Sequence, residues 1–176
     1  YVGEHFAAFL EAELAGSSYE YFADVARLEW AYQQVLVAAD HPTFDLNALA
    51  LVSPADYGAL TFSTHPAMRL VRSKFPVLAI WRANRPDAAS DERITPDQGR
   101  SSVLLLRGAD HVELRELPRA EFALLAALVR GESLEQAAEC ALEVDPRIAL
   151  DAALGRIVSL GTLVDFTAPL NSPVNH

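Results

Sequence analysis

The sequence predicts an α+β protein with N-terminal helices, a small antiparallel sheet and a C-terminal winged-helix-like module. Three observations predict this class. Residues 1–39 repeat apolar side chains at helical spacing, residues 102–117 carry the signature of a β-hairpin, and residues 118–160 contain the start and stop signals of three helices. A chain of 176 residues that is 51% hydrophobic and 22% charged is typical of one folded domain or two small modules.

Two helices are expected before residue 40. Phe6, Leu10 and Leu14 are spaced four apart and form one apolar stripe, which predicts a helix over residues 1–15. A Gly-Ser-Ser stop follows, and apolar residues then recur at spacings of three and four over residues 19–39. The second helix is therefore expected to be the longer one.

The middle of the chain predicts extended structure and then a boundary. Residues 60–71 alternate and predict an extended segment with a bend at Pro66, and Pro76 stands where proline opens a short helix over 77–83. A polar stretch with two prolines follows and predicts a loop. The expected division is residues 1–84, a loop at 85–100, and the C-terminal module at 101–176.

The C-terminal module has clear start and stop signals. Gly108 and Asp110 lie in a tight-turn sequence between two apolar strands, and Ser133 with Gln136 forms a capping-box sequence. The expected elements are strands at 102–107 and 111–117, helices that open at Pro118, Ser133 and Asp145, and a last strand at 162–166.

Charge and cysteine content exclude several classes of protein. The net charge of −10 disfavours a protein that grips nucleic-acid phosphates or docks on anionic membranes. One cysteine excludes an internal disulfide and a cysteine-based zinc site, and no apolar run approaches the length that spans a bilayer. Because Met68 is the lone methionine, we expect a chain that lacks N-terminal residues and any targeting signal among them, and we expect it in the cytoplasm.

A winged-helix-like module can bind a peptide as an added strand beside the hairpin, with side chains gripped by the third helix. The candidate peptide-binding residues are Val103, Leu105 and Arg107 on the strand, and Arg147, Asp151 and Leu154 on the helix. Residues 101–176 contain 6 basic and 11 acidic residues, which disfavours the DNA-binding use of this shape. A third alternative, that the module only packs on the N-terminal helices, remains open.

No catalytic or metal-binding motif stands out, so neither enzymatic activity nor a cofactor is expected of this chain. The histidines form no HxH, HExxH or HxxxH pair, and GxSxG, P-loop and GxGxxG sequences are absent. Cys140 lies among alanines within a predicted helix, which favours a packing role over a reactive thiol.

One stretch departs from the acidic average. Between Asp56 and Asp87 there is no carboxylate, and this window holds five cations together with Phe75 and Trp81. Two interpretations remain open: a docking surface for an acidic peptide or protein, or a solvated face that answers the acidic helices. The cations are Arg69, Arg72, Lys74, Arg82 and Arg85.

Two stretches resemble a known family. Residues 19–31, YEYFADVARLEWA, and residues 65–84, HPAMRLVRSKFPVLAIWRAN, closely resemble signature segments of the HvfC/BufC family of peptide modification chaperones. Residues 1–10 are similar to the end of the family's N-terminal half, which has been labelled a DNA-binding domain. The resemblance continues more weakly to Phe166, and the chain departs from the family by lacking most of that N-terminal half.

The resemblance implies a non-catalytic role in making ribosomal peptide natural products. Such a protein would bind the leader of a precursor peptide and present its core to an HvfB/BufB-type enzyme, whose multinuclear iron centre oxidatively modifies cysteines. Iron would then belong to the partner enzyme. For the surface that faces this enzyme, the candidates are Arg69, Arg72, Arg82 and Trp81. The alternative function is a DNA-binding transcriptional regulator.

Overall fold

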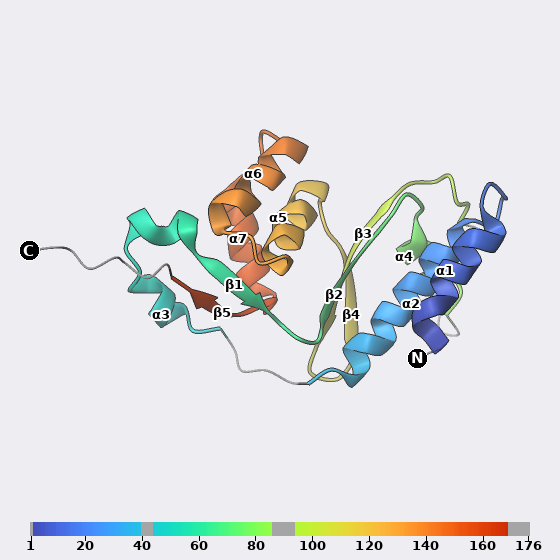
Figure 1. The fold of residues 1–176 in the computed structure, drawn as a ribbon, viewed down its shortest axis with the longest axis horizontal. Helices are drawn as coiled ribbons and strands as arrows, with labels where there is room; N and C mark the ends of the chain where they lie inside the picture. The colour runs from blue at the N-terminus through green and yellow to red at the C-terminus, as the bar shows by residue number, and fades with distance from the viewer. Residues whose placement is uncertain (1, 40–43, 86–93, 169–176) are drawn as a thin grey trace, which may run out of the picture. The chain divides into compact units, whose positions relative to one another are not determined.

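The computed structural model describes residues 2–39, 44–85 and 94–168 and has the predicted α+β fold, with helices and small antiparallel sheets (Figure 1). The chain forms two compact units, and each unit combines two separate stretches of sequence. Unit 1 contains residues 1–38 and 67–117, and unit 2 contains residues 39–66 and 118–176.

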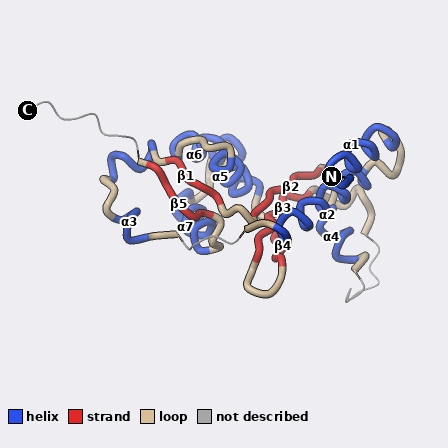
Figure 2. The backbone as a smooth tube through the Cα atoms, turned by 60° about the horizontal axis from the view of Figure 1, so that its bottom comes forward, coloured by secondary structure: helices blue, strands red, loops and turns tan. Residues whose placement is uncertain are grey.

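Unit 1 is a three-stranded sheet with helices. Its strands follow the order β2-β3-β4 and are antiparallel throughout, so β3 lies in the centre (Figure 2). The two predicted N-terminal helices are confirmed, and they lie side by side. The elements are α1 (Val2–Leu14), α2 (Tyr21–Val37), β2 (Met68–Ser73), α4 (Val77–Ala83), β3 (Ser101–Arg107) and β4 (Val112–Glu116).

The core of unit 1 lies between α2 and one face of the sheet. Leu28 and Val35 of α2 are fully buried, and they belong to one cluster with Val103 and Leu105 of β3. Side chains alternate along a strand, so Val103 and Leu105 point to the same face. Burial of such aliphatic side chains contributes about 1.5–3 kcal/mol each to the free energy of folding, and it fixes which face of β3 packs against α2.

The register determines which backbone groups of β4 point away from the sheet. Gly108 donates its N–H to the His111 carbonyl and Leu117 donates to the Ser102 carbonyl, each at 2.8 Å. In an antiparallel ladder the bonded pairs alternate with non-bonded ones, so Glu113 and Arg115 bond toward β3. The N–H and C=O groups of the residues between and beside them therefore point outward, namely those of Val112, Leu114 and Glu116.

In the described residues, unit 2 joins a two-stranded sheet to four α-helices and a 3₁₀ helix. Strand β1 pairs antiparallel with β5, and the rings of Phe62 and Phe166 on these strands lie 6.5 Å apart. The helices bury Leu124, Leu128 and Ile157. The elements are α3 (Leu46–Ala50), a 3₁₀ helix at Pro54–Ala59, β1 (Thr61–Thr64), α5 (Arg119–Val129), α6 (Leu134–Val144), α7 (Leu150–Ser159) and β5 (Leu163–Thr167).

The structure divides the chain differently from the prediction of 1–84, a loop at 85–100, and a module at 101–176. The predicted hairpin belongs to unit 1, because β3 pairs with β2 and packs on α2, whereas the helices and β5 belong to unit 2. The extended segment predicted over 60–71 forms two strands, β1 and β2, which join different sheets. Residues 86–93 of the predicted loop lie outside the described residues.

Two helix starts also differ from the prediction, and one is confirmed. Pro118 is the N-cap residue of α5 and not its first residue. Asp145 caps the end of α6, and its carboxylate accepts the Arg147 N–H at 2.9 Å in a turn that precedes α7. Helix α7 therefore begins at Leu150, five residues later than predicted. The capping box of Ser133 and Gln136 is confirmed, with both of its hydrogen bonds present.

Candidate functional site

A groove of about 520 Å³ runs along the outer edge of β4 in unit 1. One wall is the strand itself, and the other is the C-terminal end of α4 with one tyrosine of α2. Because it combines a strand edge with a helix end, the groove has the shape that an extended chain segment requires. Its lining residues are Tyr32, Trp81, Arg82, Arg85, His111, Val112, Glu113, Leu114 and Arg115.

Arg82 binds the backbone carbonyl of Leu114, at the middle of the outer edge of β4. Its guanidinium donates a hydrogen bond of 2.9 Å to the Leu114 carbonyl, which points away from β3. Arg82 is itself exposed, whereas the Leu114 side chain is half-buried and packs against the core of unit 1. The contact therefore joins an exposed side chain to the backbone of a strand that packs on the core.

Two aromatic rings form the floor between the strand and the helices. The Trp81 and Tyr32 rings have centroids 5.6 Å apart, and the Arg85 guanidinium lies 4.8 Å from the centre of the Trp81 ring. Both contacts belong to types that stabilise ring positions. Trp81 is therefore held in place in the floor of the groove, between the Tyr32 ring and the Arg85 guanidinium.

The groove is positively charged within an acidic chain. It is lined by three arginines and one glutamate, whereas the whole sequence has a net charge of −10. Arg115 binds Glu113 at 2.5 Å, and this guanidinium lowers the pKa of the Glu113 carboxyl by its hydrogen bond and its charge. Glu113 thus remains ionised and occupies Arg115, which leaves the groove suited to an anionic group beside Arg82.

A hollow of about 440 Å³, lined by aromatic rings together with Glu29 and Gln33, adjoins the groove and shares Tyr32 and Trp81 with it. Its other walls include Trp30 of α2 and Phe6 of α1, and the Phe6 side chain is 51% exposed. Large exposed rings beside a polar groove are typical of binding surfaces. The two hollows together combine charge with apolar area.

The structure corrects the placement of the peptide-binding candidates on the hairpin. Val103 and Leu105 are fully buried in the central strand β3, whose two edges are both paired within the protein. Arg107 donates a hydrogen bond to the carbonyl of Ala38 at the end of α2. A peptide cannot add to an edge that is already paired, so these three residues serve the fold and not a peptide.

The other three peptide-binding candidates lie in unit 2. Asp151 and Leu154 are on α7, but Arg147 lies in the turn before that helix. Leu154 is half-buried, and the other two are exposed. The cation of α7, Arg156, binds Glu121 of α5 at 2.5 Å. The three candidates therefore do not form one outer helix face.

The structure also separates the candidates for the enzyme-facing surface. Arg82 and Trp81 meet in the groove on α4. Arg69 and Arg72 lie three positions apart along β2, so they project from opposite faces of the strand. Arg69 donates to the Gln34 side chain at 3.1 Å, on the face that α2 covers. The four residues therefore belong to different surfaces.

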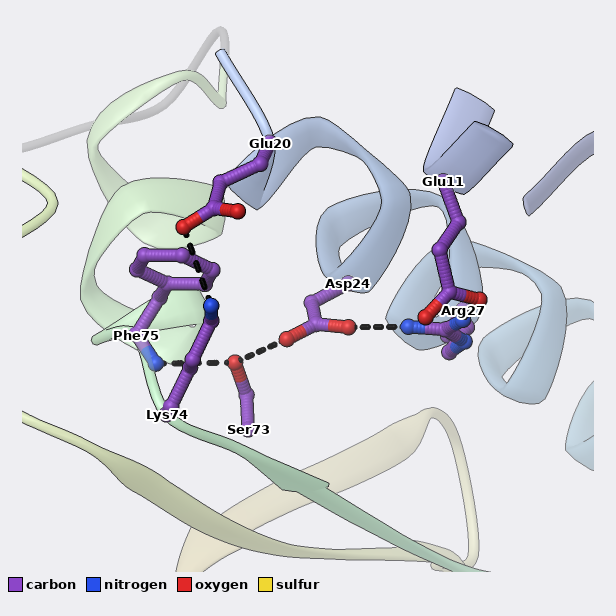
Figure 3. Close-up of polar contacts among 7 residues, drawn as sticks. All are labelled: Glu11, Glu20, Asp24, Arg27, Ser73, Lys74 and Phe75. Atoms are coloured by element: carbon purple, nitrogen blue, oxygen red, sulfur yellow. Dashed lines mark hydrogen bonds and ion pairs between the residues drawn. The ribbon is translucent and has the colours of Figure 1, made fainter. Parts of the chain in front are cut away.

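The contacts of Lys74 agree with the second interpretation of the carboxylate-free stretch between Asp56 and Asp87, in which its cations answer the acidic helices. Lys74 binds Glu20, at the start of α2, at 2.9 Å and lies over the Phe75 ring (Figure 3). The hydrogen bond from Lys74 lowers the pKa of the Glu20 carboxyl. This cation thus answers an acidic residue at the start of α2, whereas Arg82 and Arg85 of the same stretch line the groove.

Asp24 is expected to couple α2 to the end of β2. Its carboxylate accepts a hydrogen bond of 2.6 Å from the buried Ser73 hydroxyl and also pairs with Arg27 (Figure 3). Asp24→Ala should lower the free energy of unfolding by about 1–3 kcal/mol, because the Ser73 hydroxyl loses its acceptor. Urea unfolding of Asp24→Ala, Ser73→Ala and the double variant tests this, and additive effects would contradict the coupling.

Cys140 is half-buried in α6, and its thiol lies 3.7 Å from a Glu132 carboxylate oxygen. Burial and then the negative charge of Glu132 raise the pKa of the Cys140 thiol, which lowers its thiolate fraction at neutral pH. We expect slower alkylation by iodoacetamide than for free cysteine, and faster alkylation in Glu132→Gln than in Glu143→Gln. Equal rates in both variants would exclude Glu132 as a cause.

Among residues 2–39, 44–85 and 94–168, no group of three or more His, Cys, Asp and Glu side chains is placed to hold a metal ion. In the same ranges, no helix has both the length and the apolar character needed to cross a bilayer.

The outward edge of β4 is the feature that sequence analysis missed. The signal was the alternation of Val112 and Leu114, but the order of the strands decides which edge is outward.

No protein-family model, curated protein or solved structure matches this chain. The resemblance to the HvfC/BufC family therefore rests on the two stretches of sequence in which it was found.

Proposed function

We propose that this protein is a non-catalytic peptide-binding partner, and that the peptide pairs with the outer edge of β4. The observation that carries the proposal is the groove in which the outward backbone groups of Val112 and Leu114 face Trp81 and Arg82 of α4. Main-chain pairing supplies affinity without regard to sequence, and the side chains of α4 supply selectivity.

The proposed ligand is the leader of a ribosomal precursor peptide, presented to an HvfB/BufB-type enzyme whose multinuclear iron centre modifies cysteines. This finer part of the proposal is supported by the resemblance of residues 19–31 and 65–84. The second of these stretches contains Trp81 and Arg82, so the resemblance and the groove involve the same residues. The enzyme-facing surface is not assigned to a patch.

The second candidate function, a DNA-binding regulator, finds less support. Unit 2 would supply the recognition helix α7, but Arg156 on that helix is engaged by Glu121, and Arg147 lies before it. Residues 101–176 carry nearly twice as many acidic as basic residues. Recognition of the major groove requires cations and amides on the outer face of the helix, together with a basic footprint on the backbone.

Two assays with purified protein separate these functions. We expect the protein to retain the leader of a short cysteine-rich precursor encoded beside its gene, and to co-purify with a neighbouring iron enzyme. We expect no gel shift with duplex DNA at low salt. A gel shift with a steep salt dependence, together with no retention of the leader, would contradict the proposal and favour the regulator.

A further inference from the structure

We propose that the groove selects an extended peptide with a carboxylate at one fixed position, and that this carboxylate draws Arg82 away from the Leu114 carbonyl. The inference rests on the proposed function and names the class of ligand. Arg82 acts as a cap on the strand edge in the free protein and as the acid-recognition group in the complex.

The Arg82 guanidinium and an added peptide strand compete for the same acceptor, the Leu114 carbonyl. Leu114 presents its N–H and C=O outward, and the C=O already accepts a hydrogen bond from Arg82 at 2.9 Å. An added strand needs that same C=O for its own N–H. Binding therefore displaces the guanidinium, and a capped edge also discourages unspecific pairing with other strands.

The displaced guanidinium needs a new partner. A carboxylate is a better acceptor for arginine than a neutral carbonyl, because the hydrogen bonds are charge-assisted and can be bidentate. The competing acid of the groove, Glu113, is already bound to Arg115 at 2.5 Å. A ligand carboxylate would thus meet Arg82 without having to break an ion pair.

Strand geometry fixes which residue of the ligand must be acidic. Residues directly opposite each other in adjacent strands have side chains on the same face of the sheet. The Leu114 side chain lies on the face that packs against the core beneath α2, and Arg82 reaches the Leu114 carbonyl from α4. The acidic residue is therefore the one that pairs with Leu114, and its neighbours two positions away lie near Trp81 and Tyr32.

Charge complementarity selects this ligand over a neutral or basic one. The groove has three arginines to one glutamate, so its local charge favours a carboxylate although the chain as a whole carries a net charge of −10. A neutral peptide would leave the Arg82 guanidinium with water in place of its carbonyl partner. A basic peptide would add repulsion from Arg82 itself.

The test is selection from an mRNA-displayed library of random dodecapeptides on the wild-type protein, on Arg82→Leu and on Arg119→Leu. Arg119 is an exposed cation of unit 2 that does not line the groove and serves as the matched control. We expect Asp or Glu at one position of the peptides selected on the wild type and on Arg119→Leu. Peptides selected on Arg82→Leu should lack that acidic position.

One selected peptide and its Asp→Asn form are then titrated by fluorescence anisotropy. We expect the Asn form to bind the wild type about fivefold more weakly, and to bind Arg82→Leu more tightly than it binds the wild type, because the Leu114 carbonyl is uncapped. An equal Asp-to-Asn loss in both proteins would overturn this inference while leaving peptide binding intact. Enrichment of no peptide by any of the proteins would overturn the proposed function and this inference with it.

Discussion

Replacing Leu105 by alanine is expected to lower the free energy of unfolding by about 2–5 kcal/mol, the range for a buried leucine whose neighbours cannot close the cavity. Leu105 is 0% exposed at the centre of β3, in one cluster with Leu28 and Val35. The measurement is urea unfolding followed by tryptophan fluorescence, because both tryptophans, Trp30 and Trp81, lie in unit 1.

Leu106→Ala is the matched control, since Leu106 is the next residue of β3, points to the opposite face and is half-buried. We expect this variant to lose clearly less stability. A loss below about 1 kcal/mol in Leu105→Ala would contradict the assignment of Leu105 to the core.

Proline at position 105 would remove the N–H that bonds toward Arg69 of β2. A loss of peptide binding in Leu105→Pro would therefore report unfolding.

Proline at position 116 is expected to weaken peptide binding about tenfold while the fold is kept, because an outward backbone donor is lost at an exposed edge position. The Glu116 side chain also accepts a hydrogen bond from the Ser102 N–H at 2.5 Å, so Glu116→Ala is the control that loses this contact but keeps the donor. The measurement is the affinity of each variant for one peptide from the library.

Proline at position 115 is expected to unfold the hairpin, in contrast to proline at position 116, because the register places the Arg115 N–H toward β3. Arg115 bonds toward β3, so Arg115→Pro should break the ladder and unfold the hairpin. Equal affinities of Glu116→Pro and Glu116→Ala, with both variants folded, would contradict pairing of a peptide along β4.

Much of the fold could be predicted because local signals decide it. The stripe of Phe6, Leu10 and Leu14 predicts α1, and Ser133 with Gln136 marks the start of α6, where the structure has both capping bonds. The start of α7 was missed because Asp145-Pro146 suits both a helix start and a turn, and the Asp145 carboxylate caps the turn. Local sequence does not distinguish these two uses.

The site was less predictable because it depends on the order of the strands. The apolar run of residues 103–107 and the charged alternation of residues 112–116 favour the second segment as the edge strand, but the pairing of β2 with β3 is what makes one central and the other outer. That pairing joins residues 28 to 38 positions apart, from Ser73 with Ser101 to Met68 with Leu106, and no local pattern encodes it. Charge and resemblance made Arg82 and Trp81 candidates for a binding surface, but their nearness to Leu114 is a property of the fold.

Amide hydrogen exchange along β4 tests the central claim most directly. A selected peptide is added to the protein, and exchange is followed by NMR for the four residues Glu113, Leu114, Arg115 and Glu116. Pairing at the outer edge predicts an alternating result, in which the Leu114 and Glu116 amides become slower while Glu113 and Arg115, already bonded toward β3, do not change. Saturating peptide that leaves the Leu114 and Glu116 amides at their free rates would contradict the account.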